Sequence, residues 1–271
     1  MPDALLYSAS AYVFAGILGA LLGSFANVCI LRIPAGKSIV RPGSHCFGCG
    51  APVRFYDNIP LLSFLWLRGR CRVCGVRFSP RYLLVEAATA MLVVATYHLT
   101  MTVLHADDAP ERRLLRFFLY TLFIFVLVVI SFIDFDHKIV PDKITYPGIP
   151  LFTGFGILLR DRPILDLLLG VVVGYGVVRI IADGWRILFK REGMGYGDGK
   201  LLALIGGFLG WQAVLISIFA GSFIGSAVSI PILLARRTEG LMKFEVPFGP
   251  FLAAAALLYL FLQETIKLGF L

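Results

Sequence analysis

The chain has 271 residues, of which 58% are hydrophobic and 15% charged, with a formal net charge of +8 and a mean hydropathy of +0.85. This composition excludes an ordinary soluble domain. Several charge-free runs, among them residues 4–31 and 201–235, reach the roughly 20 residues that a helix needs to cross a bilayer core. The sequence therefore predicts an all-α membrane protein that crosses the bilayer several times.

The first predicted helix covers about residues 9–31 and is retained, because it lacks the basic start and small-residue exit of a cleaved signal peptide. The loop that follows carries nine Lys or Arg residues between Arg32 and Arg81 against one acid, Asp57. Basic residues this close to helix ends mark a cytoplasmic loop, and anionic lipid headgroups are natural partners for them. Because no aromatic residues alternate with the basic ones in a reading module, we expect no nucleic-acid partner.

Two CxxC pairs lie in this loop, with 21 residues between them and a glycine directly after each pair. The four cysteines are Cys46, Cys49, Cys71 and Cys74. The pattern is typical of tetrahedral zinc, and the glycine turns would help backbone N–H groups reach the thiolates. Two disulfides are the alternative, which a reducing cytoplasm disfavours. Four thiolates close the coordination shell, so we expect a structural zinc ion.

Further helices are expected at about residues 83–104, 114–133, 144–159, 164–188, 201–210, 211–235 and 248–268. Threading them from the cytoplasmic loop predicts about eight spans, with both termini outside and every strongly basic loop inside, including Arg236, Arg237 and Lys243. Pro147 and Pro150 could kink or delay the helix at 144–159. In the helix from residue 164, Arg179 and Asp183 are four positions apart and able to pair.

Two acids are expected at the inner ends of different helices. Asp134 follows an apolar run in the stretch IDFDHKIVPD, and Asp198 precedes another in GYGDGK. Carboxylates at the hydrocarbon boundary are costly unless they are paired or hydrated. Two carboxyl groups held close share a proton, so that one can activate water while the other polarises a carbonyl. Gly195 and Gly197 would admit a substrate backbone and would tolerate φ angles closed to other residues.

Other interpretations of these acids remain open at the level of composition. Asp198 could cap the helix that it precedes. Asp136 and Asp142 could be solvated residues or turn formers, and composition does not choose Asp134 over Asp136.

Six stretches of the chain resemble the bacterial prepilin peptidases, or type IV leader peptidases, a family of GxGD aspartic membrane proteases. They are GSFANVCILRIP, the CxxC loop with YDNIPLLSFLWLRGRC, SPRYLLVE, IDFDHKIVPD, GYGDGKLLA and VPFGPFLA. The resemblance implies that Asp134 and Asp198 form the catalytic pair, with Asp136, Gly195 and Gly197 in a supporting catalytic loop. It implies cleavage of the leader of type IV prepilins or type II secretion pseudopilins at the cytoplasmic face.

The resemblance also implies a second reaction, N-methylation of the new N-terminal residue with S-adenosylmethionine as methyl donor. No nucleotide-binding fingerprint is visible, so this activity rests on the family alone and its cofactor site is not predicted. A leader peptidase without methyl transfer, and a zinc-binding membrane transporter or sensor, are the alternatives. Acids that could attract a basic leader are Asp57, Glu86, Asp136 and Asp142.

We therefore expect three parts in the chain. They are a first transmembrane helix at residues 1–32, a cytoplasmic tetracysteine domain at residues 33–82 and a transmembrane aspartic peptidase core at residues 83–271. The expected location is the bacterial inner membrane, with both termini on the periplasmic side. The expected partners are prepilin or pseudopilin substrates and the lipid bilayer.

Overall fold

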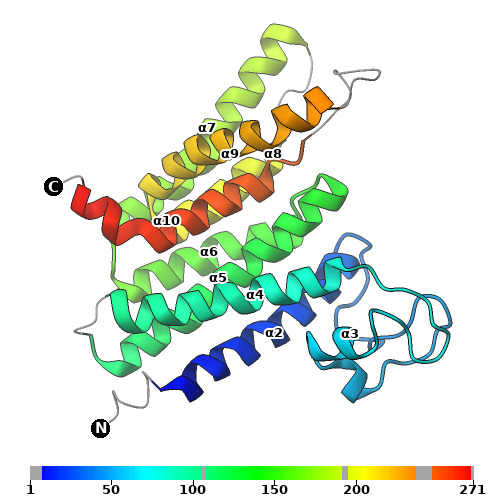
Figure 1. Ribbon diagram of the computed structural model, residues 1–271. Helices are drawn as coiled ribbons and strands as arrows, with labels where there is room; N and C mark the ends of the chain where they lie inside the picture. The colour runs from blue at the N-terminus through cyan, green and yellow to red at the C-terminus, as the bar shows by residue number, and fades with distance from the viewer. Residues whose placement is uncertain (1–7, 105–107, 191–194, 236–245, 270–271) are drawn as a thin grey trace. The chain divides into compact units, whose positions relative to one another are not determined.

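The computed structural model describes residues 8–104, 108–190, 195–235 and 246–269, and these contain helices and no named strand (Figure 1). The chain divides into two compact units, Met1–Val129 and Ile130–Leu271. The expected partition at residues 1–32, 33–82 and 83–271 is a functional one, which this division does not test, and it stays a prediction. Arg236, Arg237, Lys243 and both chain ends lie outside the described residues.

In the N-terminal unit, α2 (Ala9–Arg32) packs closely on α4 (Arg81–His98), which a π-helical turn, η2 (Leu99–Val103), continues. A Cβ at Gly19 or at Gly23 would lie 2.7 Å from a Cα atom of α4. Small residues four positions apart are the device by which membrane helices approach each other. The glycines of α2 therefore bring these two helices together.

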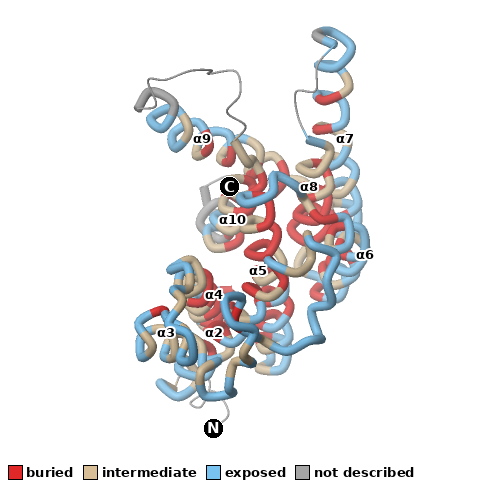
Figure 2. Tube along the Cα trace, turned by 90° about the vertical axis from the view of Figure 1, so that its right-hand side faces the viewer, coloured by how far each residue is buried: buried red, intermediate tan, exposed pale blue. Residues whose placement is uncertain are grey.

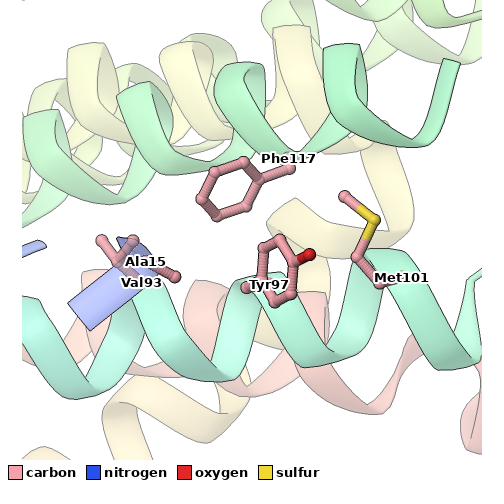
Figure 3. Packing of buried hydrophobic residues seen from close by; sticks show 5 residues of the cluster. All are labelled: Ala15, Val93, Tyr97, Met101 and Phe117. Atoms are coloured by element: carbon pink, nitrogen blue, oxygen red, sulfur yellow. The ribbon is translucent and has the colours of Figure 1, made fainter. Parts of the chain in front are cut away.

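A buried cluster of Ala15, Val93, Tyr97, Met101 and Phe117 fills this unit (Figure 3). The ring of Tyr97 stands edge-on to that of Phe117, with 5.2 Å between ring centroids, an arrangement that aromatic pairs favour. Because Phe117 comes from α5 (Pro110–His137), the cluster joins the first half of α5 to α2 and α4.

The C-terminal unit is built around α8 (Tyr196–Leu209), in which every residue from 201 to 209 is buried (Figure 2). The helices in contact with it are α6 (Asp142–Leu159), α7 (Ile164–Phe189), α9 (Trp211–Ala235) and α10 (Gly249–Gly269). Fourteen residues make a helix of about 21 Å, shorter than the roughly 30 Å of a bilayer core. A helix that is apolar on all sides belongs in an interior, and α8 is such a helix.

Glycines let α6 and α7 approach the backbone and side chains of α8 closely. A Cβ on Gly170 of α7 would overlap the backbone of Gly206, and one on Gly174 would lie 2.6 Å from the carbonyl carbon of Leu202. On α6, a Cβ at Gly148 would lie 2.7 Å from Leu204 Cδ1. This close packing sets the height of α8 along α7, and with it the position of the residues in the first turn of α8.

The all-α, polytopic prediction is confirmed. Eight helices of 14 or more residues occupy the expected positions in the described part of the chain. Five of them are long and apolar enough to cross a membrane. The expected break after residue 210 is also confirmed, because α8 ends at Leu209, α9 begins at Trp211 and Gly210 has a φ of 84°.

Two details of the expected helices are resolved by the structure. The helix expected at 144–159 is not delayed by its prolines, since α6 begins at Asp142 and contains both. Arg179 and Asp183 do pair, with 2.7 Å between Nε and Oδ2. The helix expected at 114–133 is longer at both ends, so Asp134 lies inside α5 and not after it.

We expect Gly170→Leu to destabilise the protein, because the new side chain would overlap the α8 backbone, and overpacking costs about 1–3 kcal/mol. Gly176→Leu on the same helix is the matched control, since nothing lies within 4 Å of a Cβ there. Thermal unfolding in detergent should show a lower midpoint for Gly170→Leu alone. Equal midpoints for the two variants would contradict the close crossing of α7 and α8.

Candidate active site

Asp134 is a buried carboxyl group in the last turn of α5, with 5% of its surface exposed. Its Oδ2 accepts a hydrogen bond from the backbone N–H of Gly249 at 2.9 Å. Gly249 is the first residue of α10, so the free N–H groups and positive end of that helix face the carboxyl group. A Cβ at this position would lie 2.7 Å from Oδ2, so a larger residue would require the carboxyl group to shift, and glycine allows the close approach without a shift.

Asp198 is the third residue of α8, whose N-cap is Gly195. The alternative in which Asp198 caps this helix is therefore wrong. The expectation of unusual backbone angles is also wrong, because Gly195 has a φ of −72° and Gly197 is helical. The structure gives Gly197 a different role. A Cβ there would lie 2.9 Å from Cβ of Val140, so glycine lets the segment before α6 pack against the first turn of α8.

Asp134 and Asp198 line one cavity of about 610 Å³ in the C-terminal unit. The two carboxyl groups are near enough to interact electrostatically. Lys138 and Lys200 also line the cavity, and much of the remaining wall is apolar, including Trp185 of α7 and Phe248 before α10. A concave, mostly apolar site with a few convergent polar groups is typical of ligand-binding cavities of this size.

The first turn of α8 is tied to its neighbours by polar contacts. The hydroxyl group of Tyr196 donates to Asp183 Oδ1 at 2.7 Å, and the guanidinium of Arg179 lies 4.8 Å from the centroid of the Tyr196 ring. The ammonium group of Lys200, in the same part of α8, pairs with Asp142 of α6. These contacts orient the segment that carries Asp198.

The structure gives different environments to the remaining acids that the sequence analysis considered. Asp136 is exposed and is not among the residues that line the cavity. Asp142 pairs with Lys200, Asp57 pairs with Arg72 at 2.6 Å, and Glu86 is buried. Asp57 and Asp142 are thus engaged within the protein, and Glu86 is withdrawn from its surface.

Gly249 is the site residue that the sequence reasoning missed. It lies in the stretch VPFGPFLA, which contributed to the family resemblance without receiving a role. The resemblance of that stretch was the available signal. Its contact with Asp134 joins positions 115 apart, so no local pattern could indicate it.

The four loop cysteines form a compact cluster in the N-terminal unit. Their sulfur atoms all lie within 4.8 Å of one another, and those of Cys46 and Cys74 are 3.7 Å apart. A tetrahedron with metal–sulfur bonds of about 2.3 Å has edges of about 3.8 Å, whereas a disulfide needs about 2.05 Å. All the cysteines are free thiols, so the alternative of two disulfides is wrong and the cluster fits a bound metal.

Each cysteine pair is held by the same backbone turn. Gly50 N–H donates to the Cys46 carbonyl and Gly75 N–H to the Cys71 carbonyl, both at 2.9 Å. Both glycines have positive φ, 70° and 72°, which favours glycine. The expected contact of backbone N–H groups with sulfur is present at Cys46, which accepts from Gly48 N–H at 3.3 Å.

The thiols differ in their readiness to ionise. Backbone N–H groups of Cys74 and Val73 lower the pKa of Cys71 to about 7. At Cys74 the N–H of Val76 also lowers the pKa. Burial and the neighbouring thiols outweigh this effect and raise the pKa of Cys74 to about 12. Crowded thiolates repel one another, and a divalent cation at their centre removes that cost.

Comparisons with known proteins cover both parts of the site. Residues 17–100, which include the cysteine loop, match the family model of the bacterial peptidase A24 N-terminal domain. Residues 121–230, which include both aspartates, match that of the type IV leader peptidase family. No solved structure gives a significant match to the chain.

Curated relatives align over most of the chain. One from Aeromonas hydrophila is 36% identical over 93% of this chain and 90% of its own length. Another from Pseudomonas putida is 35% identical over 89% of this chain and 87% of its own, and one from Pseudomonas aeruginosa is 33% identical over 88% and 86%. All three are named prepilin leader peptidase/N-methyltransferase.

Proposed function

Because the chain belongs to the type IV leader peptidase family, we propose that it cleaves the leader peptide of prepilins and then N-methylates the new N-terminal residue. The methyl donor for the second reaction is S-adenosylmethionine. The observation that carries the peptidase is the pair of carboxyl groups, from α5 and α8, lining one cavity. The same pairing disfavours the transporter or sensor alternative, which needs a polar pathway through the bundle.

We further propose that Asp134 is the general base and Asp198 the general acid. The N–H of Gly249 and the positive end of α10 stabilise a negative charge on Asp134, and two close carboxyl groups favour a single charge. The other charged groups lining the cavity are Lys138 and Lys200, of which Lys200 pairs with Asp142. Asp198 also lies at the positive end of a helix, its own α8, so the hydrogen bond from Gly249 N–H is what makes Asp134 the better site for the charge and Asp198 for the shared proton.

These roles define the hydrolysis. Asp134 takes a proton from water, whose oxygen attacks the scissile carbonyl while Asp198 donates a hydrogen bond to the carbonyl oxygen. When the C–N bond breaks, a proton passes to the leaving amine, and the pair is left with one proton to share. No covalent intermediate is needed.

A prepilin suits this site physically. Its leader is basic and stays in the cytoplasm, while the segment after the scissile bond is apolar and lies in the bilayer. The apolar cavity walls near Trp185 and Phe248 support binding of such a segment beside the carboxyl groups. On the basis of the family resemblance, we extend the proposal to type II secretion pseudopilins and to the bacterial inner membrane. The basic loops support termini on the periplasmic side. Asp136, Gly195 and Gly197 keep their proposed supporting place in the catalytic loop.

We propose that the metal of the four cysteines is a structural zinc ion. Four thiolates at these separations complete a tetrahedral shell and leave no position for reactive water. Zinc would therefore hold the loop in shape and take no part in hydrolysis. Methyl transfer has no assigned residues, and the family resemblance is the ground on which we link it to this loop.

Asp134→Asn and Asp198→Asn should each abolish leader removal, because an amide can neither take the proton from water nor supply it to the carbonyl. Asp166→Asn, in the first turn of α7, is the matched control and should cleave normally. Gel mobility of a synthetic prepilin incubated with each purified variant measures this. Full cleavage by either Asp134→Asn or Asp198→Asn would remove the proposed mechanism.

Gly249→Ala and Gly249→Pro test the assignment of the base. Both add a Cβ next to Asp134, but only proline lacks the N–H donor, and proline is well tolerated as a first helical residue. Cleavage needs ionised Asp134 and is lost as pH falls. Since a hydrogen bond to a charged group contributes about 1.5–3 kcal/mol, this loss should occur about one to two pH units higher in the proline variant.

The measurement is the pH profile of leader cleavage by the two variants. Coincident pH profiles of the two variants would contradict the role of Asp134 as base, while the proposed peptidase activity would still stand. Slower cleavage with an unchanged profile would show that Gly249 serves packing alone.

Replacing Cys46 and Cys49 together by serine should remove the bound zinc, because two of four thiolates are lost. Cys29→Ser is the matched control, since Cys29 is buried in α2 and outside the cluster. Metal analysis of the purified proteins should find one zinc per chain in the control and little in the double variant. Full zinc content in the double variant would contradict the site, and normal methyl transfer without zinc would separate that activity from the loop.

A further inference from the structure

The cysteine loop exposes a small apolar face on α3 (Leu62–Trp66). Leu62, Leu65 and Trp66 leave 64%, 62% and 83% of their surface exposed. Because they are three and four positions apart, they share one side of the helix. Phe55, in the preceding turn, is 86% exposed. Clustered exposed apolar side chains of this size mark a contact with a protein or a membrane.

A partly buried hydrogen bond places the start of α3 against the membrane helices. Leu61 N–H donates to Oε2 of Glu86 at 2.8 Å, and the side chain of Ser24 on α2 bonds to the same carboxyl group. Glu86 is the sixth residue of α4, so it lies about 7–8 Å inside that helix at 1.5 Å per residue. The bond thus fixes α3 beside the apolar part of α4, past its basic first residue.

The arrangement of the backbone agrees with this depth. Figure 1 shows α3 doubled back beside the ends of α2 and α4 at which the loop begins and ends. Leu61 has a φ of 64°, a conformation that residues other than glycine rarely adopt. The contact with Glu86 therefore holds the chain in a reversal that local preference would not favour.

The charges near α3 favour a lipid surface over a protein as the partner of its exposed apolar face. Arg68 and Arg70 follow the helix directly, and the one acid of the loop, Asp57, is already paired with Arg72. The uncompensated positive charge suits anionic headgroups, and tryptophan is favoured at the membrane interface. Both ends of the loop continue into helices apolar enough to cross the membrane, so the bilayer is always within reach.

We propose that α3 is an interfacial anchor, with Leu62, Leu65 and Trp66 inserted among the lipids on the loop's own side of the membrane. The depth of such helices is roughly 5–10 Å into the boundary between headgroups and acyl chains. Glu86 is the positioning residue that sets the depth of the anchor. The cysteine loop is then held to the membrane at three places, by α2, by α4 and by α3.

Tryptophan fluorescence in lipid nanodiscs tests the anchor on the full chain. Trp66→Phe removes the fluorescence of Trp66 and leaves Trp185 and Trp211 unchanged, so the difference between the two proteins isolates Trp66. In discs of anionic lipid with bromine placed high on the acyl chain, an interfacial Trp66 should lose roughly half or more of its emission. Emission from Trp66 that bromine does not affect would overturn the anchor and point to a protein partner.

Two comparisons make the test specific. Val73→Trp, added to the Trp66→Phe protein, places a tryptophan at a 70% exposed position between Cys71 and Cys74, and it should escape quenching. If the tryptophan at position 73 were quenched as strongly as Trp66, the proposed insertion of α3 alone would be wrong, and the whole loop would lie flat on the lipid. Glu86→Ala should reduce quenching of Trp66, while Glu86→Gln, which keeps an acceptor for Leu61, should preserve most of it. Unchanged quenching in Glu86→Ala would overturn the role of Glu86.

Discussion

The proposed chemistry of this protein depends on holding two carboxyl groups, from helices far apart in sequence, against one cavity. Neither carboxyl group is carried by a loop, since each belongs to a residue within a helix. Asp198 sits in the first turn of α8, whose position follows from backbone contact between Gly206 and Gly170 of α7. Asp134 is held in the last turn of α5 by the N–H of Gly249. Close contacts at glycine therefore fix the positions of both carboxyl groups, a task that side-chain hydrogen bonds perform in a soluble enzyme.

A second consequence is that the two carboxyl groups are not equivalent. Both lie near the N-terminal end of a helix, Asp198 in the first turn of α8 and Asp134 against the start of α10. The hydrogen bond from Gly249 N–H to Asp134 is the difference that separates the proposed roles of two identical side chains. The cysteine loop follows another strategy. With Cys46 as its one buried cysteine and little core of its own, it takes its shape from two similar turns around the cysteine cluster. Its proposed place at the membrane depends on the buried Glu86.

Much of this could be predicted from the sequence. Charge-free runs indicated the helices, the φ-permissive Gly210 marked the break between α8 and α9, and the cysteine spacing predicted the cluster. The end of α5 could not be predicted, because Phe135, Asp136 and His137 look like a loop although they form an exposed helical turn. The need for glycine at positions 197 and 249 was invisible for a different reason. It arises from Val140 and Asp134 in distant segments, not from the local backbone.

The most direct test of the central claim measures binding, because it works equally well on inactive proteins. A prepilin-like peptide in which a hydroxyl-bearing isostere replaces the scissile amide should place that hydroxyl between Asp134 and Asp198. Its affinity would be measured for the wild-type protein, for each Asp→Asn variant and for the double variant. If the two groups act on one atom, each single change weakens binding strongly and the second change adds little. Independent, additive losses, or an unchanged affinity in either single variant, would contradict a shared site.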